Sequence, residues 1–311
     1  MGLPTVTISI LNYQRKEALR HALLSAAGQR YPRLEVIVVD NASTDGSDRM
    51  VEEHFPHVRL VRLPENIGCA ARNAGVAAAR GEIVVTLDND VLLTGSDDVA
   101  AVVEVFARNP TVACVDFRVL DGEGRLSQRD WCHPRDWRRF EHEEFLTDCV
   151  LEGASGFRRQ AFERIGGYWA PFFIGHEGLD LALRAIDAGY EILYTPAVSV
   201  RHLVSPEARP SSRIYYTFVR NGIWIALRHH RPLFAAASIL RDLALVGFAS
   251  LRAREVRAYL RGGRDAILGA GTALRFRRPL SRTSYRRLAR IRAYRPGMIQ
   301  RVRRHLSRRL I

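Results

Sequence analysis

Two carboxylates one residue apart, Asp88 and Asp90, end an apolar run that begins after Gly81. The run over residues 82–87 predicts a buried strand, and in open α/β sheets ligands bind beyond the carboxyl ends of the strands. Acids there are costly unless they meet a cation or a hydroxyl group. Because hard divalent cations take oxygen ligands and bridge to phosphates, the pair suggests a metal–diphosphate site. Asp and Asn are also ordinary turn residues, so the motif alone does not decide.

Strand and helix patterns alternate through the first half of the chain. Strands are predicted at residues 6–10, 34–39, 58–63 and 82–87, and helices at 17–27, 48–54 and 66–80. This alternation implies right-handed βαβ units and a mainly parallel, Rossmann-like sheet, so the predicted fold class is α/β. Further along, short strands are predicted at 191–194 and 198–202. The polar stretch 121–140 is predicted to be either a loop over a cleft or a plain connection.

Charge divides the chain of 311 residues into two parts. Residues 201–311 hold 26 arginines and 4 acids, whereas residues 1–200 hold 21 basic and 29 acidic residues, which together give the net charge of +14. We therefore predict an α/β domain over 1–210 and a basic, mainly helical region over 211–311. Such a region suits an anionic membrane surface, and nucleic acid is disfavoured because no nucleic-acid motif accompanies the charge.

Six segments resemble, in order, the motifs of the family 2 inverting nucleotide-sugar glycosyltransferases, and they lie at residues 8–13, 35–47, 66–75, 88–90, 175–181 and 196–202. Any one motif is weak, but six in order are specific. The resemblance covers about residues 4–204 and is closest to bacterial rhamnosyltransferases. It implies the GT-A fold and a single displacement that inverts the sugar, with no covalent enzyme intermediate.

The resemblance assigns five residues to the nucleotide of the donor. Asn12 lies in the base-binding turn after the first strand, and Asp40 would accept the N3–H of uracil or thymine. Arg72 would donate to a base carbonyl or a phosphate, and Asp88 with Asn89 would lie on the ribose side. Asp40 has an equally plausible role as an acid that caps its own loop.

The remaining assignments concern a metal and a base. The resemblance implies that Asp90 and His202 would hold a divalent cation, Mn²⁺ or Mg²⁺; Asp90 supplies oxygen, and borderline metals such as Mn²⁺ accept the imidazole of His202. Either Glu177 or Asp180 would take the proton of the acceptor hydroxyl. The family commonly has Glu-Asp where this chain has Glu177-Gly178, which divides the base assignment.

The cysteines and the termini bear on location. No C-x-x-C pair occurs among Cys69, Cys114, Cys132 and Cys149, so reduced cytosolic thiols are expected. No signal peptide is recognised at the start, and the apolar stretch 232–251 is predicted to be a poor membrane span because Arg241-Asp242 interrupts it. An amphipathic, interfacial helix is the alternative. The expected location is the cytoplasm, peripheral on the inner face of the cell membrane.

The sequence thus predicts an enzyme that moves a sugar from a UDP- or dTDP-sugar to a lipid-linked or glycan acceptor, in the synthesis of cell-surface polysaccharide or glycolipid. Two alternatives stay open. One is a nucleotide- or glycan-binding relic that has lost catalysis, which the glycine at position 178 favours. The other is a polybasic protein that binds membrane or nucleic acid, for which the tail alone argues.

Overall fold

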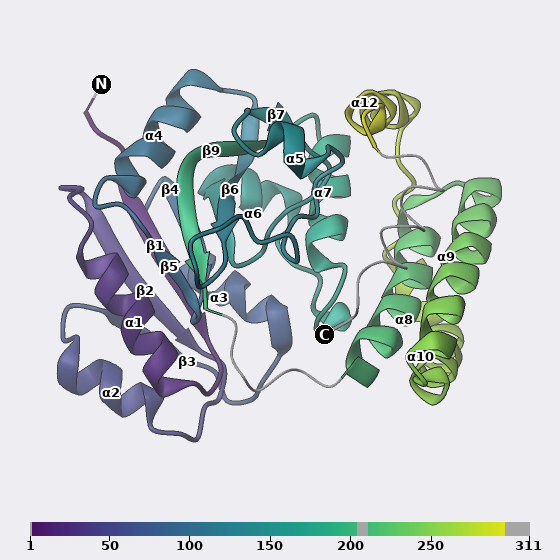
Figure 1. The fold of residues 1–311 in the computed structure, drawn as a ribbon, viewed down its shortest axis with the longest axis horizontal. Helices are drawn as coiled ribbons and strands as arrows, with labels where there is room; N and C mark the ends of the chain where they lie inside the picture. Colours follow the sequence, from purple (N-terminus) through teal and green to yellow (C-terminus); the bar gives the residue numbers. More distant parts are fainter. Residues whose placement is uncertain (1, 204–210, 296–311) are drawn as a thin grey trace.

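A computed structural model describes residues 2–203 and 211–295 (Figure 1). The first part is built on one nine-stranded sheet. Its parallel half has the order β3-β2-β1-β4, from Arg59–Arg62, Leu34–Asp40, Val6–Asn12 and Ile83–Asp88. β2, β1 and β4 are apolar runs rich in β-branched residues, and they are central strands because helices cover both of their faces, whereas β3 lies at the edge.

The other half of the sheet is mixed. Its strands are β5 (Val91–Leu93), β6 (Val112–Leu120), β7 (Phe145–Leu146), β8 (Ala154–Arg158) and β9 (Glu191–His202). β8 pairs antiparallel with β4 and β6, and β9 runs parallel to β6. The predicted α/β class is confirmed. The two short strands expected near the end are one strand, β9, because it follows β6 through a register shift after Phe117.

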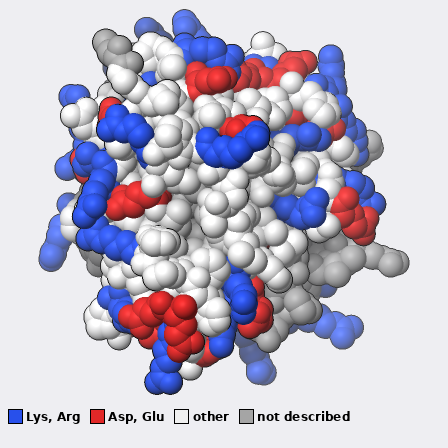
Figure 2. Space-filling model, turned by 90° about the vertical axis from the view of Figure 1, so that its left-hand side faces the viewer, with Lys and Arg blue, Asp and Glu red and all other residues white. Residues whose placement is uncertain are grey.

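Helices cover both faces of the sheet. One face packs against α1 (Lys16–Ala27), α2 (Ser47–His54) and α4 (Asp98–Arg108), and the other against α3 (Ala71–Ala78), α6 (Arg159–Ile165) and α7 (Glu177–Asp187). Alternate residues of β2 show this division, because Val38 belongs to the first core and Ile37 and Val39 to the second. On the face in Figure 2, basic and acidic side chains are interspersed.

The stretch 121–140 is anchored rather than loose. Trp131 packs against Tyr194 with ring centroids 5.0 Å apart, and the short helix α5 spans Trp137–Phe140. Cys132 and Cys149 form a disulfide, with Cα atoms 6.3 Å apart. The prediction of four free thiols is therefore wrong for this pair, because β7 folds the chain back so that residues 17 apart in sequence meet. Cys69 and Cys114 are free and buried, as expected.

Helices follow β9, as the sequence predicted, and they are α8 (Ser211–His229), α9 (Pro232–Arg252), α10 (Val256–Leu268), α11 (Ala270–Arg275) and α12 (Arg282–Arg292). Trp224 and Leu288 share a core with Phe172 and Leu183. α8 and α12 thus pack against α7 and the turn before it, whereas α9 packs against α8 and α10 (Figure 1). The division at residues 210 and 211 stays a prediction, because residues 204–210 lie outside the described part.

Helix α9 differs from the expectation for residues 232–251. By length and composition alone it is long and apolar enough to cross a membrane, which is weak support for a span. Arg241 and Asp242 interrupt the apolar run, and their side chains pair with each other at 2.8 Å. Leu233, Leu240 and Leu251 are exposed at its surface.

Candidate active site

Three neighbouring strands bring polar residues to one edge of the sheet. β1 ends at Asn12 and β2 at Asp40, and these two residues are register partners. β4 ends at Asp88, which lies opposite Leu11 of β1. Because the strands are parallel, their carboxyl ends meet at the position where α/β sheets bind ligands. The structure therefore brings these predicted donor residues together.

Asn12, Asp40 and Asn89 are hydrogen-bonded to one another. The Asn12 amide nitrogen donates to Asp40 Oδ1 at 2.9 Å, and Asn89 Nδ2 donates to Asn12 Oδ1 at 2.8 Å. Asp40 Oδ2 accepts the backbone N–H of Ser43 at 2.9 Å, which is the loop-capping role that the sequence left open. Asn12 is fully buried, so this network forms the floor of the site and holds its loops in place.

Arg72 and Asp88 form a buried ion pair beside this floor. Arg72 lies in the first turn of α3, after the 3₁₀ turn η1 (Gly68–Ala70), and its Nη2 contacts Asp88 Oδ1. Burial would lower the pKa of Arg72, but Asp88 together with Cys69, Tyr168 and Glu152 outweighs burial and raises the pKa above its ordinary value. The guanidinium therefore stays charged and holds Asp88 in position.

Asp90 and His202 face each other across β5 and β9. β5 pairs antiparallel with β9, so that Val91 lies opposite His202. The distance from His202 Nε2 to Asp90 Oδ1 is 3.6 Å, and Arg15 contacts Asp90 Oδ2. Burial would raise the pKa of Asp90, but attraction by His202 and Arg15 lowers it below its ordinary value. The predicted pair of metal ligands is thus adjacent in space.

Asp130 contacts His202 of this pair, and it was not predicted from the sequence. Its Oδ2 lies 2.9 Å from His202 Nδ1, and it accepts the Ser127 hydroxyl at 2.6 Å. Burial lowers the pKa of His202, but Asp130 and Asp90 outweigh it and raise the value to about 10. Asp130 stands in the polar 121–140 stretch among many acids and arginines, and no spacing signal marked it.

The residues at this place fit a divalent cation. One carboxylate and one imidazole within 3.6 Å of each other match the donors that Mn²⁺ accepts. Within residues 2–203 and 211–295, no cluster of three or more His, Cys, Asp or Glu side chains is arranged around a metal position. A cation held by two side chains suits a site in which substrate phosphates complete the coordination.

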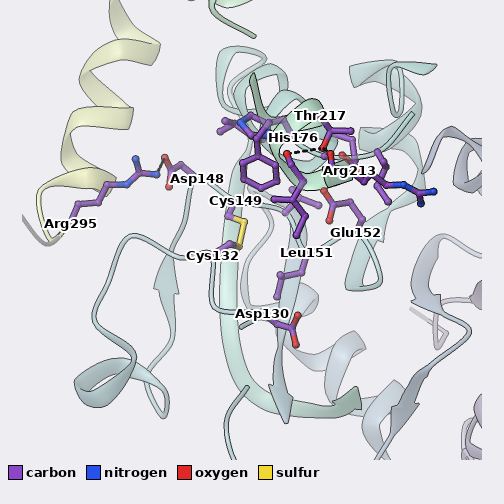
Figure 3. A pocket seen from close by; sticks show the side chains of 17 residues that line it. Asp130, Cys132, Asp148, Cys149, Leu151, Glu152, His176, Arg213, Thr217 and Arg295 are labelled. Atoms are coloured by element: carbon purple, nitrogen blue, oxygen red, sulfur yellow. Dashed lines mark hydrogen bonds and ion pairs between the residues drawn. A yellow bond between two sulfur atoms is a disulfide. The ribbon is translucent and has the colours of Figure 1, made fainter. Parts of the chain in front are cut away.

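A cavity of about 520 Å³ lies beyond the strand ends (Figure 3). It is lined by the 130–152 segment with its disulfide, by the turn before α7, and by α8. Glu177, the first residue of α7, lines it with an exposure of 6%, and its Oε2 has no partner among the described groups. Burial raises the pKa of this carboxyl above its ordinary value. Both features suit a group that accepts a proton.

The turn before α7 is held in an uncommon backbone conformation. Phe173 and His176 have φ of 60° and 71°, and Gly175 has φ of 89°. Asn221 of α8 secures the turn, because its Nδ2 donates to the carbonyls of Ile174 at 2.9 Å and Gly175 at 2.6 Å. A non-glycine residue at positive φ persists only where its surroundings hold it there. The packed helices thus fix the place of Glu177.

Asp180, the other candidate base, is engaged elsewhere. It is fully buried, and its carboxylate contacts Arg184 at 2.7 Å, Arg228 at 3.0 Å and His229 at 2.7 Å. Burial would raise the pKa of Asp180, but these partners lower it below its ordinary value. Asp180 does not line the cavity and instead ties α7 to α8. The geometry favours Glu177 as the candidate base.

Comparison with known proteins bears on this arrangement. The sequence profile described as "Glycosyl transferase family 2" matches residues 7–166, which is just over half of the 311 residues. The chain belongs to glycosyl transferase family 2. The matched region contains the strand ends with Asp40, Asp88 and Asp90, and it stops before Glu177 and His202. Those two residues therefore rest on the geometry and the motifs given above.

Three similar proteins illustrate the family. The chain is 26% identical over 254 residues to the O-antigen biosynthesis protein RfbC of Myxococcus xanthus, covering 74% of this chain and 19% of the relative. It is 23% identical to the N-acetylglucosaminyl-diphospho-decaprenol L-rhamnosyltransferase of Mycobacterium tuberculosis, covering 67% and 79%. The mannosyltransferase PcManGT from Pyrobaculum calidifontis, solved with GDP-Man and Mn²⁺, is 23% identical with a TM-score of 0.57, covering 98% and 88%.

The solved structure and the curated relatives support different conclusions about this chain. The solved structure supports a GT-A transferase fold for this member of family 2. The chain spans only 19–26% of the length of several curated relatives, including a chondroitin synthase and RfbC. Whole-protein activities of those relatives therefore do not carry over directly.

Proposed function

We propose that this family 2 chain transfers a sugar from a UDP- or dTDP-sugar to a lipid-linked or glycan acceptor, with inversion at the sugar carbon, in cell-surface polysaccharide or glycolipid synthesis. One observation carries the proposal. The Asp90–His202 pair lies near the strand ends, and a separate cavity is lined by Glu177, whose Oε2 has no partner among the described groups. Leaving-group stabilisation and proton acceptance, the two tasks of glycosyl transfer, thus have separate groups.

At the donor end, we assign Asp40 to the base and Arg72 with Asp88 to the phosphates and ribose. Asp40 uses one lone pair of each oxygen within the protein, which leaves a lone pair for a base N–H. Asn89 donates a hydrogen bond to Asn12, and Asn12 in turn donates to Asp40 and holds it in place. The mutual ion pair orients Arg72 and Asp88 before the nucleotide binds.

We assign Asp90 and His202 to a divalent cation, Mn²⁺ or Mg²⁺. When bound, the cation would offset the negative charge that builds on the diphosphate leaving group. Asp130 would orient His202 through Nδ1, in the way that carboxylates orient metal-binding histidines. Arg15 contacts Asp90 and would keep that carboxylate ionised.

At the acceptor end, Glu177 takes the proton of the attacking hydroxyl. The oxygen of that hydroxyl forms the new bond to the sugar carbon while the bond to the diphosphate breaks. A base works best when its pKa lies near the working pH, and burial moves the pKa of Glu177 in that direction. Asp180 is unsuited because three cationic or imidazole partners occupy its oxygens.

We also propose peripheral attachment to the inner face of the cell membrane. Exposed leucines lie on α9, and α9 belongs to residues 201–311, which carry 26 arginines and 4 acids. Apolar side chains beside arginines suit an interface rich in anionic lipid. Flotation with vesicles that contain anionic lipid at low salt should recover the chain. Absence from the vesicle fraction would contradict the attachment.

A panel of nucleotide sugars tests the transferase proposal. Calorimetric titration with and without Mn²⁺ should find a uridine or thymidine diphosphate sugar that binds only with the cation, and that sugar should be hydrolysed slowly or transferred. Binding of a sugar without any turnover would favour the catalytically inactive relic. Lack of binding across the panel would contradict the proposed function.

A further inference from the structure

Gly178 has no side chain, and the chain segment 150–152 occupies the space beside it. Gly178 is the second residue of α7, directly after Glu177. A Cβ atom built on it would overlap the Val150 carbonyl oxygen and Oε1 of Glu152. No side chain fits at this position unless the 150–152 segment moves. The family commonly has an acid where this chain has Gly178. The 150–152 segment approaches Gly178 closely and contributes an acid of its own, Glu152.

Glu152 is fixed in that place from two sides. Its Oε1 accepts the backbone N–H of Gly178 at 2.6 Å, at the N-terminus of α7 where a negative charge is favoured. Its backbone carbonyl accepts the hydroxyl of Thr86 at 2.9 Å, and the Gly153 carbonyl accepts the Asp88 N–H at 3.2 Å. The carboxyl of Glu152 is thereby held between β4, which carries the donor acids, and α7.

Glu152 and Glu177 line the same cavity (Figure 3 labels Glu152). Burial and the nearby charge of Glu177 together raise the pKa of Glu152 to about 8, although Arg72 and the hydrogen bond from Gly178 oppose them. Arg72 already pairs with Asp88 and compensates only part of the charge of two more acids. Two neighbouring buried carboxyls that are poorly compensated favour a state in which a proton is retained on the pair.

We propose that Glu152 takes the place of the acid that position 178 lacks, and that it forms with Glu177 one carboxyl pair that receives the proton of the acceptor. This inference rests on the proposed transferase function. In the reaction the acceptor O–H bond breaks, its oxygen bonds to the sugar carbon, and the diphosphate leaves with the electrons of the old bond. The proton joins the ionised member of the pair and passes to water after product leaves.

Glu152→Gln tests the pair. It keeps the size of the side chain and an acceptor oxygen for Gly178 N–H, and it removes the charge. We expect kcat to fall by about 100-fold or more, with the KM of the donor sugar within about twofold of the wild type. Because paired groups act as a unit, Glu152→Gln with Glu177→Gln should be no slower than the slower single variant. Glu143→Gln is the matched control, because Glu143 is exposed in the same segment.

A second variant separates chemistry from structure. Glu152→Ala supplied with formate should regain part of its turnover, because a small carboxylate can enter the space left beside Glu177. A folded Glu152→Gln variant that keeps kcat within about twofold, while Glu177→Gln is slow, would overturn the pair and leave the proposed function intact. Loss of turnover in Glu152→Ala without rescue, together with a raised donor KM, would also overturn it in favour of a structural role. A wild-type chain that transfers no sugar would contradict the proposed function itself.

Discussion

The two ends of the site differ in how their carboxylates are partnered. At the donor end, Asp88 and Asp90 each contact an arginine side chain. At the acceptor end, Glu177 has a buried oxygen without a partner among the described groups, and Glu152 accepts a backbone N–H. In the proposed mechanism, arginines orient the carboxylates of the donor end before the nucleotide binds, whereas the acceptor end is suited to exchange a proton.

This difference has a physical cause. An arginine beside a carboxylate favours its ionised form, which suits a group that must bind a cation or orient a nucleotide. Burial without a cation favours the protonated form, which suits a group that must accept and release a proton. The opposite directions of the pKa shifts of Asp90 and Glu177 agree with this division of work.

The largest expected effect is at the donor end. Asp90→Ala should lower turnover by about a thousandfold or more and remove the Mn²⁺ dependence of nucleotide binding, because it deletes a proposed cation ligand. The fold should survive, since Asp90 lies in a turn between β4 and β5. Steady-state kinetics and calorimetry check both effects. Asp97→Ala is the control, because Asp97 pairs with Arg30 at the surface. Wild-type turnover in Asp90→Ala would refute the donor assignment.

The next effect is at the acceptor end. Glu177→Gln should lower kcat by about 10²- to 10⁴-fold, the usual contribution of a general base. In the wild type, kcat should fall as the pH drops through the raised pKa of Glu177, because the protonated carboxyl cannot accept a proton. That fall should begin at a higher pH than an ordinary Glu would give, and it should be absent in Glu177→Gln. Glu163→Gln, at an exposed helical pair with Arg159, is the control. An equal loss in Asp180→Asn with normal stability would transfer the base role to Asp180.

Asp180→Asn should instead weaken the fold. Removing one partner from a buried ionic cluster costs about 3–5 kcal/mol in the free energy of unfolding, because Arg184 and Arg228 lose their counter-charge. The pKa of Asp180 is lowered in the folded chain, so its stabilising effect is present above the ordinary Asp pKa and is lost as the pH falls through the lowered value. Urea unfolding at several pH values measures this effect. Unchanged stability would show that the cluster does not join α7 to α8.

A smaller effect is expected from the disulfide. Cys132→Ser should lower the free energy of unfolding by about 3 kcal/mol, on the chain-entropy estimate for a loop of roughly 15 residues. The bond lies in the wall of the acceptor cavity, so the KM of the acceptor should rise more than that of the donor (Figure 3). Thermal unfolding and kinetics with and without reductant measure both. Cys69→Ser, at a free cysteine, shows the effect of losing a thiol alone. A larger rise in the KM of the donor than in that of the acceptor would contradict the assignment of this cavity to the acceptor.

Local patterns were sufficient to predict the parallel half of the sheet and the meeting of the proposed donor residues at its edge. Asn12, Asp40 and Asp88 stand at the ends of strands that apolar runs mark clearly, and parallel strands bring such ends together. The roles within the group were harder to predict, because Asp40 and Asn89 bind other side chains of the floor. Such pairings depend on side-chain positions that spacing does not encode.

The acceptor end could not be predicted to the same degree. Glu152 and Asp130 lie in a segment without periodicity, and they reach the site only because the Cys132–Cys149 bond and β7 fold that segment back. Two of the partners of Asp180, Arg228 and His229, come from α8, about 49 residues further along the chain. Long-range contacts of this kind leave no local signal in the sequence. Gly178 nevertheless marked the position at which this chain departs from the common Glu-Asp motif of the family.

The affinity for the nucleotide in two variants tests the central division most directly. Titration of uridine or thymidine diphosphate in the presence of Mn²⁺ should give a Kd for Glu177→Gln within about twofold of the wild type, and a Kd for Asp90→Ala that is raised by about 100-fold or more. That result would place nucleotide binding at the donor end and leave proton transfer to the acceptor end. Equal weakening in both variants would contradict the separation of the two ends.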